Sequence, residues 1–203
     1  VSLLSKGDHA IYRSCVGKIL WLAPIRPDIS YAVKELSRSL TEPTEEDKAK
    51  LKHLARYLRG TSDYTLLISS KCIYAEDVPG KITVYVDSDW AGCHKTRKST
   101  TGVCVFYNDV LVHHYSRTQA TVALSSAEAE LYAIGTGTID GVFLLQFVRY
   151  LGLPIETKCS IYVYTGSSSA KIYSYPSRLL KDYQAQSATI SACSGFSESR
   201  TIR

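Results

Sequence analysis

The sequence contains no methionine and no Cys-x-x-Cys pair, and it has no run of about 18 consecutive apolar residues, the length that a membrane-spanning helix needs. Its six cysteines are scattered, at positions 15, 72, 93, 104, 159 and 193. This spacing disfavours a zinc site and favours a reducing intracellular compartment, the cytoplasm or the nucleus. Because the chain starts with Val and has no signal peptide, we expect an internal fragment of a longer protein, without membrane contact.

The charge of the chain is only modestly unbalanced. It has 24 basic and 19 acidic side chains, a net charge of +5, and 45% of its residues are hydrophobic. This composition is that of a globular protein with a packed core. A net charge of this size permits binding to a polyanion such as nucleic acid without requiring it.

Two carboxylates follow an expected strand in the middle of the chain. Residues 84–86 are strand-forming, and Asp87 and Asp89 come directly after them. Because they are one residue apart, both side chains leave the same side of an extended chain. Such carboxylates repel each other, and a hard divalent cation would allow both to stay ionised. The alternative is that one Asp starts a turn and the other is solvated.

The first 68 residues predict a mainly helical region. Apolar side chains recur at helical spacing over residues 10–40, interrupted at Pro24 and Pro27. The pattern predicts two helices joined by a rigid elbow, with Asp28 or Ser30 available to cap the second helix.

A third helix is predicted from Thr44 to Gly60, with a hydroxyl cap and three acids in its first turn, and residues 64–68 then predict a strand. One face of this helix is basic: Lys48, Lys52, Arg56 and Arg59. The basic face is either a solvated surface or a contact for a phosphate backbone.

Beyond a polar segment that ends at Pro79-Gly80, the pattern changes from helices to strands. After the strand that leads to Asp87, residues 102–107 predict a second strand, a hairpin turn follows at 108–109, and residues 110–112 begin the return strand. A helix of about 25 residues and a strand at 160–165 come next. This order predicts an α/β fold, a mixed sheet with a helix packed on one face.

The long helix carries two glutamates near its start. Ser125 and Glu128 form the capping-box pattern Ser-x-x-Glu, so Glu128 has a structural role. Glu130 lies beyond the cap, beside the apolar stripe, where a carboxylate is costly unless it has a partner.

The connection between the first two strands is basic, with Lys95, Arg97 and Lys98 within four residues. These side chains are either phosphate contacts or ordinary soluble surface. Arg117 is a further basic residue near the same strands.

Several segments match a known family in order. The sequences Tyr-Val-Asp-Ser-Asp-Trp-Ala-Gly at 85–92, Arg-Lys-Ser-Thr-Thr-Gly at 97–102 and Thr-Val-Ala-Leu-Ser-Ser-Ala-Glu-Ala-Glu-Leu at 121–131 together resemble the ribonuclease H domain of copia-type retrotransposon polyproteins. The first half agrees, because residues 12–17, 26–33, 36–38 and 56–61 resemble the end of the reverse transcriptase in the same polyproteins.

The resemblance implies a ribonuclease H-like fold, with a mixed five-stranded sheet flanked by helices and preceded by a small, mostly helical connection region. Residues 1–75 would be the end of the reverse transcriptase, residues 76–183 the ribonuclease H-like domain and residues 184–203 a poorly ordered tail. The implied partners are an RNA–DNA hybrid and the reverse transcriptase portion of the same polyprotein.

In this family, acidic residues hold two Mg²⁺ ions that assist hydrolysis of the RNA strand of an RNA–DNA hybrid. The resemblance maps the first acid onto Asp87, with Asp89 as second choice, and the helix glutamate onto Glu130. The third acid is replaced by Gly166 within Thr-Gly-Ser-Ser-Ser-Ala, and Asp182 matches the fourth poorly by spacing. We therefore expect the second Mg²⁺ to lack ligands and the activity to be reduced or absent.

Three functional hypotheses remain open at this point. The first is a metal-dependent ribonuclease H. The second is a catalytically inactive remnant that binds nucleic acid through Lys95, Arg97, Lys98, Arg117 and the helix that begins at Thr44. The third is an interaction module without a role on nucleic acid, which rests only on the modest net charge.

Overall fold

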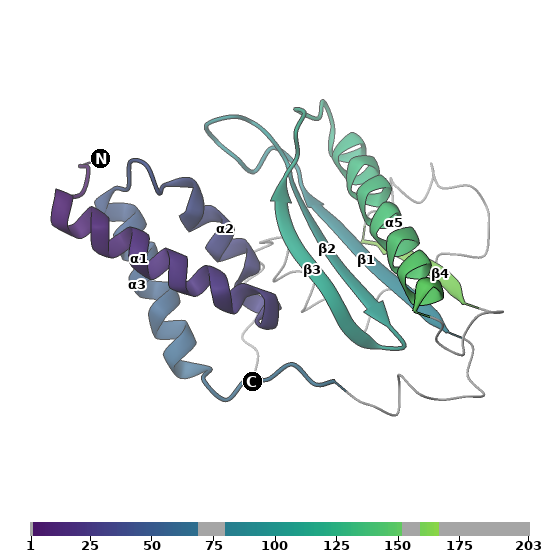
Figure 1. Ribbon diagram of the computed structural model, residues 1–203. Helices are drawn as coiled ribbons and strands as arrows, with labels where there is room; N and C mark the ends of the chain where they lie inside the picture. The colour runs from purple at the N-terminus through teal and green to yellow at the C-terminus, as the bar shows by residue number, and fades with distance from the viewer. Residues whose placement is uncertain (1, 69–79, 152–158, 167–203) are drawn as a thin grey trace. The chain divides into compact units, whose positions relative to one another are not determined.

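The computed structural model describes residues 2–68, 80–151 and 159–166 (Figure 1). The chain folds as two compact units, which we call the helical unit (Val1–Leu66) and the sheet unit (Leu67–Arg203). The boundary predicted from the sequence, at residue 75, lies in the segment 69–79, which is outside the described residues. The predicted tail, 184–203, is outside the described residues.

The helical unit packs three helices around one apolar core. They are α1 (Lys6–Leu22), α2 (Ser30–Arg38) and α3 (Glu45–Gly60), and the short 3₁₀ helices η1 (Ala23–Ile25) and η2 (Pro27–Ile29) form the predicted elbow. The buried core consists of Tyr12, Val16, Ile29, Val33, Leu36, Leu51 and Leu54. The buried Tyr12 hydroxyl donates to the carbonyl of Leu36 at 2.8 Å, so its hydrogen-bonding capacity is satisfied within the core.

The predicted caps of the helical unit are partly right. Thr44 caps α3 in a reciprocal capping box with Asp47. Neither Asp28 nor Ser30 caps α2, which begins without a side-chain cap. Asp28 instead accepts two hydrogen bonds from the Arg26 guanidinium, at 2.9 and 2.7 Å. The predicted strand at 64–68 is wrong, because these residues pair with no other strand in the described structure.

The sheet unit contains a mixed sheet with the strand order β3-β2-β1-β4 (Figure 1). Its strands are β1 (Lys81–Asp89), β2 (Thr100–Tyr107), β3 (Val110–Thr118) and β4 (Ser160–Thr165). The β1–β2 and β2–β3 pairs are antiparallel, and β1 and β4 are parallel. The predicted α/β class and mixed sheet are confirmed; within the described ranges the sheet has four strands instead of five.

The predicted hairpin turn between β2 and β3 is confirmed. Asn108 and Asp109 both have positive φ angles, 44° and 65°, as the two central residues of a type I′ turn require. The Asn108 side-chain oxygen also accepts from the Lys81 amide at 2.8 Å, which ties the turn to the start of β1.

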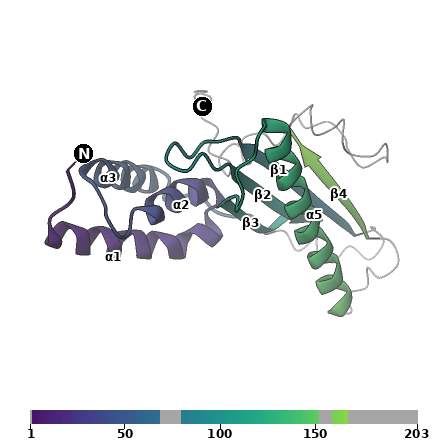
Figure 2. The same cartoon turned by 90° about the horizontal axis from the view of Figure 1, so that it is seen from above.

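The helix α5 (Ser126–Tyr150) covers one face of the sheet (Figure 2). It lies unusually close to the sheet because two glycines face it. A Cβ on Gly137 would overlap the Val86 side chain, and a Cβ on Gly141 would meet Val84 at 2.9 Å. The even-numbered side chains of β1 therefore point to α5 and form the core of the sheet unit.

By length and composition α5 is apolar enough to cross a membrane, and it is the one such helix among the described residues. Its contacts give it another role. It packs on β1, β2 and β4, and Asp140 on α5 accepts a hydrogen bond from Tyr115 of β3 at 2.7 Å. These contacts identify α5 as the helix that covers the sheet.

We expect Gly137→Ala to lower the free energy of unfolding of the sheet unit by about 1–3 kcal/mol, because the added methyl group overpacks the stiff Val86 side chain. Gly135→Ala is the matched control. A Cβ there meets nothing within 4 Å, so this change should stabilise the helix by up to about 1 kcal/mol. Urea unfolding followed by Trp90 fluorescence, in a Trp21→Phe background, measures both. Equal effects of the two substitutions would contradict the close approach.

Candidate functional site

The candidate site lies at one edge of the sheet, where three element ends meet. Because β1 and β4 are parallel, their carboxyl ends, at Asp89 and Thr165, share this edge. The first turns of α5 reach the same edge, since the Thr165 hydroxyl donates to Glu130 Oε2 at 3.1 Å. In open α/β sheets, ligands commonly bind at the carboxyl ends of the strands.

Glu130 is a buried carboxylate, with 6% of its surface exposed. Burial raises its pKa above the ordinary value, and the negative charge of Asp87 raises it further. Hydrogen bonds from Ser88 and Thr165 act in the opposite direction. Asp87 and Glu130 are therefore close enough to interact electrostatically, although 43 positions separate them in the sequence.

The two carboxylates approach the edge from opposite sides of the sheet. The β1 residues that face α5 are even-numbered, so strand alternation directs Asp87 to the other face. That face also carries Tyr85, whose ring stacks on Tyr164 of β4 with centroids 5.1 Å apart. The sequence placed Asp87 and Asp89 on one side of the strand, and this alternation agrees with it.

Asp89, the second-choice ligand, ends β1 and lies against the following turn. A Cβ on Gly92 would overlap the Asp89 carboxylate, so a larger residue there would require the Asp89 side chain to move. The turn contains Ala91 with a φ of 54°, in the left-handed region that non-glycine residues rarely adopt. Asp89 is thus part of the turn as well as a neighbour of Asp87.

Gly166 occupies the place next to Asp87. In the parallel β1–β4 register the last pair is Val86 and Thr165, so Gly166 is the following residue on the β4 side. A Cβ at Gly166 would meet no atom within 4 Å. The edge therefore has space for an acidic side chain at this position. Asp182 lies outside the described residues.

The basic connection between β1 and β2 has a fixed backbone. The Trp90 indole donates to the Ala123 carbonyl at 3.1 Å, and the Ala91 amide donates to Ser99 Oγ at 3.0 Å. The Cys93 sulfur accepts from the Thr96 hydroxyl at 2.9 Å. These hydrogen bonds give the loop a defined shape although it lies outside the sheet.

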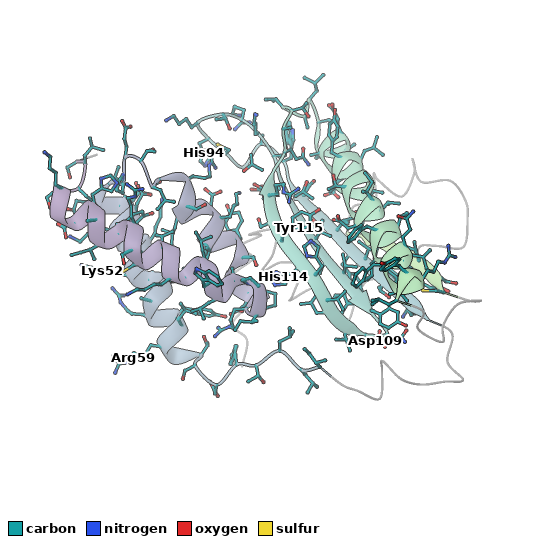
Figure 3. All side chains as sticks on the ribbon, viewed as in Figure 1. Lys52, Arg59, His94, Asp109, His114 and Tyr115 are labelled. Atoms are coloured by element: carbon teal, nitrogen blue, oxygen red, sulfur yellow. The ribbon has the colours of Figure 1, made fainter. Side chains whose placement is uncertain are left out.

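The cations of this loop point outward. Lys95 and Arg97 are exposed and Lys98 is partly buried. Arg117 is exposed at the same end of the sheet, since it pairs with Thr101 of β2. Its guanidinium lies over the Tyr115 ring, 4.7 Å from the centroid. Figure 3 labels Tyr115 on β3.

Gln119 is a buried residue that the sequence reading did not single out. Its amide donates to Thr101 Oγ1 at 3.0 Å and to the Ala129 carbonyl at 2.9 Å. These bonds fix the segment after β3 to the first turn of α5 and so position Glu130. The sequence offers no periodic or motif signal for this role.

The carboxylates at this edge are the type of ligand that a hard divalent cation prefers, but they are few. Carboxylate oxygens are the ligands that Mg²⁺ prefers. No group of three or more His, Cys, Asp or Glu side chains in the described ranges could hold a metal ion. Asp87 and Glu130 are two carboxylates that reach this edge from opposite faces, so a metal site here would need ligands beyond these two.

A separate cleft of about 500 Å³ lies between α5 and strands β2 and β3. Its lining is mainly apolar and includes Val105, Phe143 and Phe147. These residues belong to the C-terminal half of α5 and the strand segments beside it, away from Glu130. The acid in its lining is Asp140, which accepts a hydrogen bond from Tyr115, so the cleft includes neither Asp87 nor Glu130.

Comparison with known proteins places the chain in a family. An uncharacterized mitochondrial protein of Arabidopsis thaliana, AtMg00810, is 38% identical over 134 residues. The retrovirus-related Pol polyprotein from transposon RE1 of the same plant is 32% identical over 155 residues, 76% of this chain. The secreted RxLR effector protein 161 of Plasmopara viticola is 37% identical over 139 residues, which are 68% of this chain and 94% of that protein. The chain belongs to the Pol polyproteins of copia-type retrotransposons.

The match covers only part of AtMg00810 and of the RE1 polyprotein. The aligned residues are 66% of this chain and span about half, 53%, of AtMg00810, and they span 10% of the RE1 polyprotein. No family model and no solved structure matches the chain. The copia-type resemblance predicted from the sequence is confirmed.

We expect Glu130→Gln to stabilise the sheet unit of this copia-type chain at pH 7.5 and to have little effect at pH 3.5. The folded-state pKa of Glu130 is raised above 4.5. The stability from this group is therefore fully present below the unfolded pKa and is lost as pH rises through the folded pKa. Urea midpoints across this pH range measure the effect.

Glu128→Gln is the control on the same helix. Glu128 is partly buried and accepts from the Leu124 amide at 2.7 Å, so its replacement should not stabilise the protein at either pH. Destabilisation by Glu130→Gln at pH 7.5 would contradict a strained, buried carboxylate.

Proposed function

We propose that the sheet unit is a ribonuclease H that hydrolyses the RNA strand of RNA–DNA hybrids with a divalent metal ion, and that its activity is reduced by Gly166. The carrying observation is the buried Glu130 carboxylate, whose pKa is raised by burial and by the charge of Asp87 at the same sheet edge. Strained carboxylates of this kind gather at functional sites.

Asp87 and Glu130 would hold the metal ion, preferably Mg²⁺. When bound, the ion supplies charge stabilisation to the attacking and leaving oxygens of a phosphodiester. The residues of this chain prepare the site before any ion arrives. Thr165 orients one Glu130 oxygen by its hydrogen bond, and Gln119 fixes the start of α5.

Gly166 explains why we expect weak activity. A third acid at this position would add a formal charge of about −1 to a site that faces roughly +4 in two metal ions. The chain offers space there but no carboxylate. Loss of groups that only support the ligands already costs about 10–100-fold, so loss of a ligand should cost at least as much.

The second candidate is a remnant that binds nucleic acid without cleaving it. The small acidic set in the described ranges favours it, together with the exposed Lys95 and Arg97 at the same end of the sheet. In either case, the helical unit would be the end of the reverse transcriptase of the same polyprotein, a portion that the relatives' name Pol also suggests.

We expect Gly166→Asp to raise Mg²⁺-dependent cleavage of a labelled RNA–DNA hybrid by at least 10–100-fold, as the scale for a restored ligand suggests. Gly166→Asn is the matched control, because it has nearly the same shape without the charge, and it should leave cleavage at the original level. Equal cleavage by both variants and the original chain would show that position 166 is not part of the site.

The Gly166→Asp variant also allows the roles of Asp87 and Glu130 to be tested. In the Gly166→Asp chain, Asp87→Asn or Glu130→Gln should each abolish the gained cleavage, whereas Glu128→Gln should retain it. Cleavage that survives the loss of Asp87 and Glu130 would come from another centre and would overturn the proposed function.

We expect the triple substitution of Lys95, Arg97 and Lys98 by Ala to weaken hybrid binding and to reduce its salt dependence. Three lost phosphate contacts lower the slope of log affinity against log salt by about 2.7. Fluorescence anisotropy in EDTA measures binding without cleavage. An unchanged slope would remove the loop from the nucleic-acid surface.

A further inference from the structure

The outward face of α3 in the helical unit carries a row of cations. Leu51 and Leu54 on the inward face are buried in the core. Lys52, Arg56 and Arg59 lie on the opposite face and are exposed; Figure 3 labels the first and last of them on α3. We call these three residues the α3 cation row.

Most acids of the helical unit are already engaged by other cations or by a cap. The ion pairs are Arg26–Asp28 at 2.7 Å, Lys34–Glu35 at 2.6 Å, Lys48–Asp8 at 2.9 Å and Lys50–Glu46 at 2.7 Å. Asp47 accepts from the Thr44 amide and hydroxyl in the capping box. Among the described residues, Lys52, Arg56 and Arg59 of α3 remain exposed outside these ion pairs, as do Lys6, Arg13 and Lys18 of α1.

The α3 cation row makes no hydrogen bond or ion pair within the described residues. Lys52 acts on Asp8 only through its charge, which helps to lower the pKa of that carboxyl. The sequence alone gave four basic residues on this helix face. The structure separates Lys48, which is paired, from the three that are not.

The spacing of the row suits a phosphate backbone. Seven residues of helix rise about 10.5 Å. One strand of a duplex carries a phosphate about every 3.4 Å along its axis, so the row spans about three of them. Two of the three side chains are Arg, whose planar fork of donors matches phosphate oxygens.

We propose that the α3 cation row binds the sugar–phosphate backbone of a duplex nucleic acid without reading its sequence. The choice of nucleic acid as partner rests on the proposed function, but the surface belongs to the other unit and to none of the residues assigned to cleavage. Charge complementarity and the free donors carry the assignment.

The test is anisotropy of the full chain with a labelled RNA–DNA hybrid in EDTA, at 50–200 mM salt. Replacing Lys52, Arg56 and Arg59 by Ala should lower the salt slope by about 2.7, so that across this range affinity falls roughly 40-fold less than in the original chain. The matched control replaces Lys34, Arg38 and Lys50 by Ala. The control also removes three positive charges, but these cations already have carboxylate partners. The salt slope should therefore fall by less than about 1.

Three results would overturn the proposal. An unchanged slope in the row variant excludes the surface, and an equal fall in the control shows that only net charge matters. Row-dependent binding to vesicles of phosphatidylserine and phosphatidylcholine, without row-dependent binding to the hybrid, would assign the row to a membrane. This binding test measures no cleavage. The ribonuclease proposal is tested separately by the cleavage activity of the Asp87 and Glu130 variants, so the two proposals can fail independently.

Discussion

The close approach of α5 to β1 is the constraint on which the sheet unit depends. Gly137 and Gly141 let the helix backbone lie against the Val84 and Val86 side chains, and any larger residue at either position would push the helix outward. With the helix this close, the second turn of α5 delivers Glu130 into the interior at the carboxyl end of β1. The same glycines that compact the core therefore fix the geometry of the candidate site.

That geometry explains why an unfavourable group is retained in the interior. A buried carboxylate next to Asp87 destabilises the folded chain at neutral pH, and neutral hydrogen bonds from Thr165 and Ser88 offset only part of this effect. A divalent cation would convert the repulsion into binding energy. Gly166 adds no carboxylate at this edge, so under our proposal a bound ion would have one acidic ligand fewer there.

Local sequence patterns predicted most helices, strands and turns, but they could not predict contacts between residues that are far apart in the sequence. The turn at Asn108 and Asp109 and the caps at Thr44 and Ser125 depend on neighbouring residues, so the sequence displays them. The strand predicted at 64–68 was wrong because apolar composition alone does not provide a pairing partner. Asp28 was expected to cap α2, but Arg26 takes its carboxylate, and that choice depends on the fold around it.

The charge distribution shows the same division between local and long-range information. Composition gives a net charge of +5, which alone does not locate a binding surface. Ion pairs across helices, such as Lys48 with Asp8, then neutralise some cations and leave others exposed, and a one-dimensional reading of α3 cannot tell which. Exposed cations outside these ion pairs lie on α1 and α3 in the helical unit, and in the β1–β2 loop and on other elements of the sheet unit. Under our proposals, the exposed cations of α3 and those of the β1–β2 loop both bind phosphates, and neither set needs a particular base.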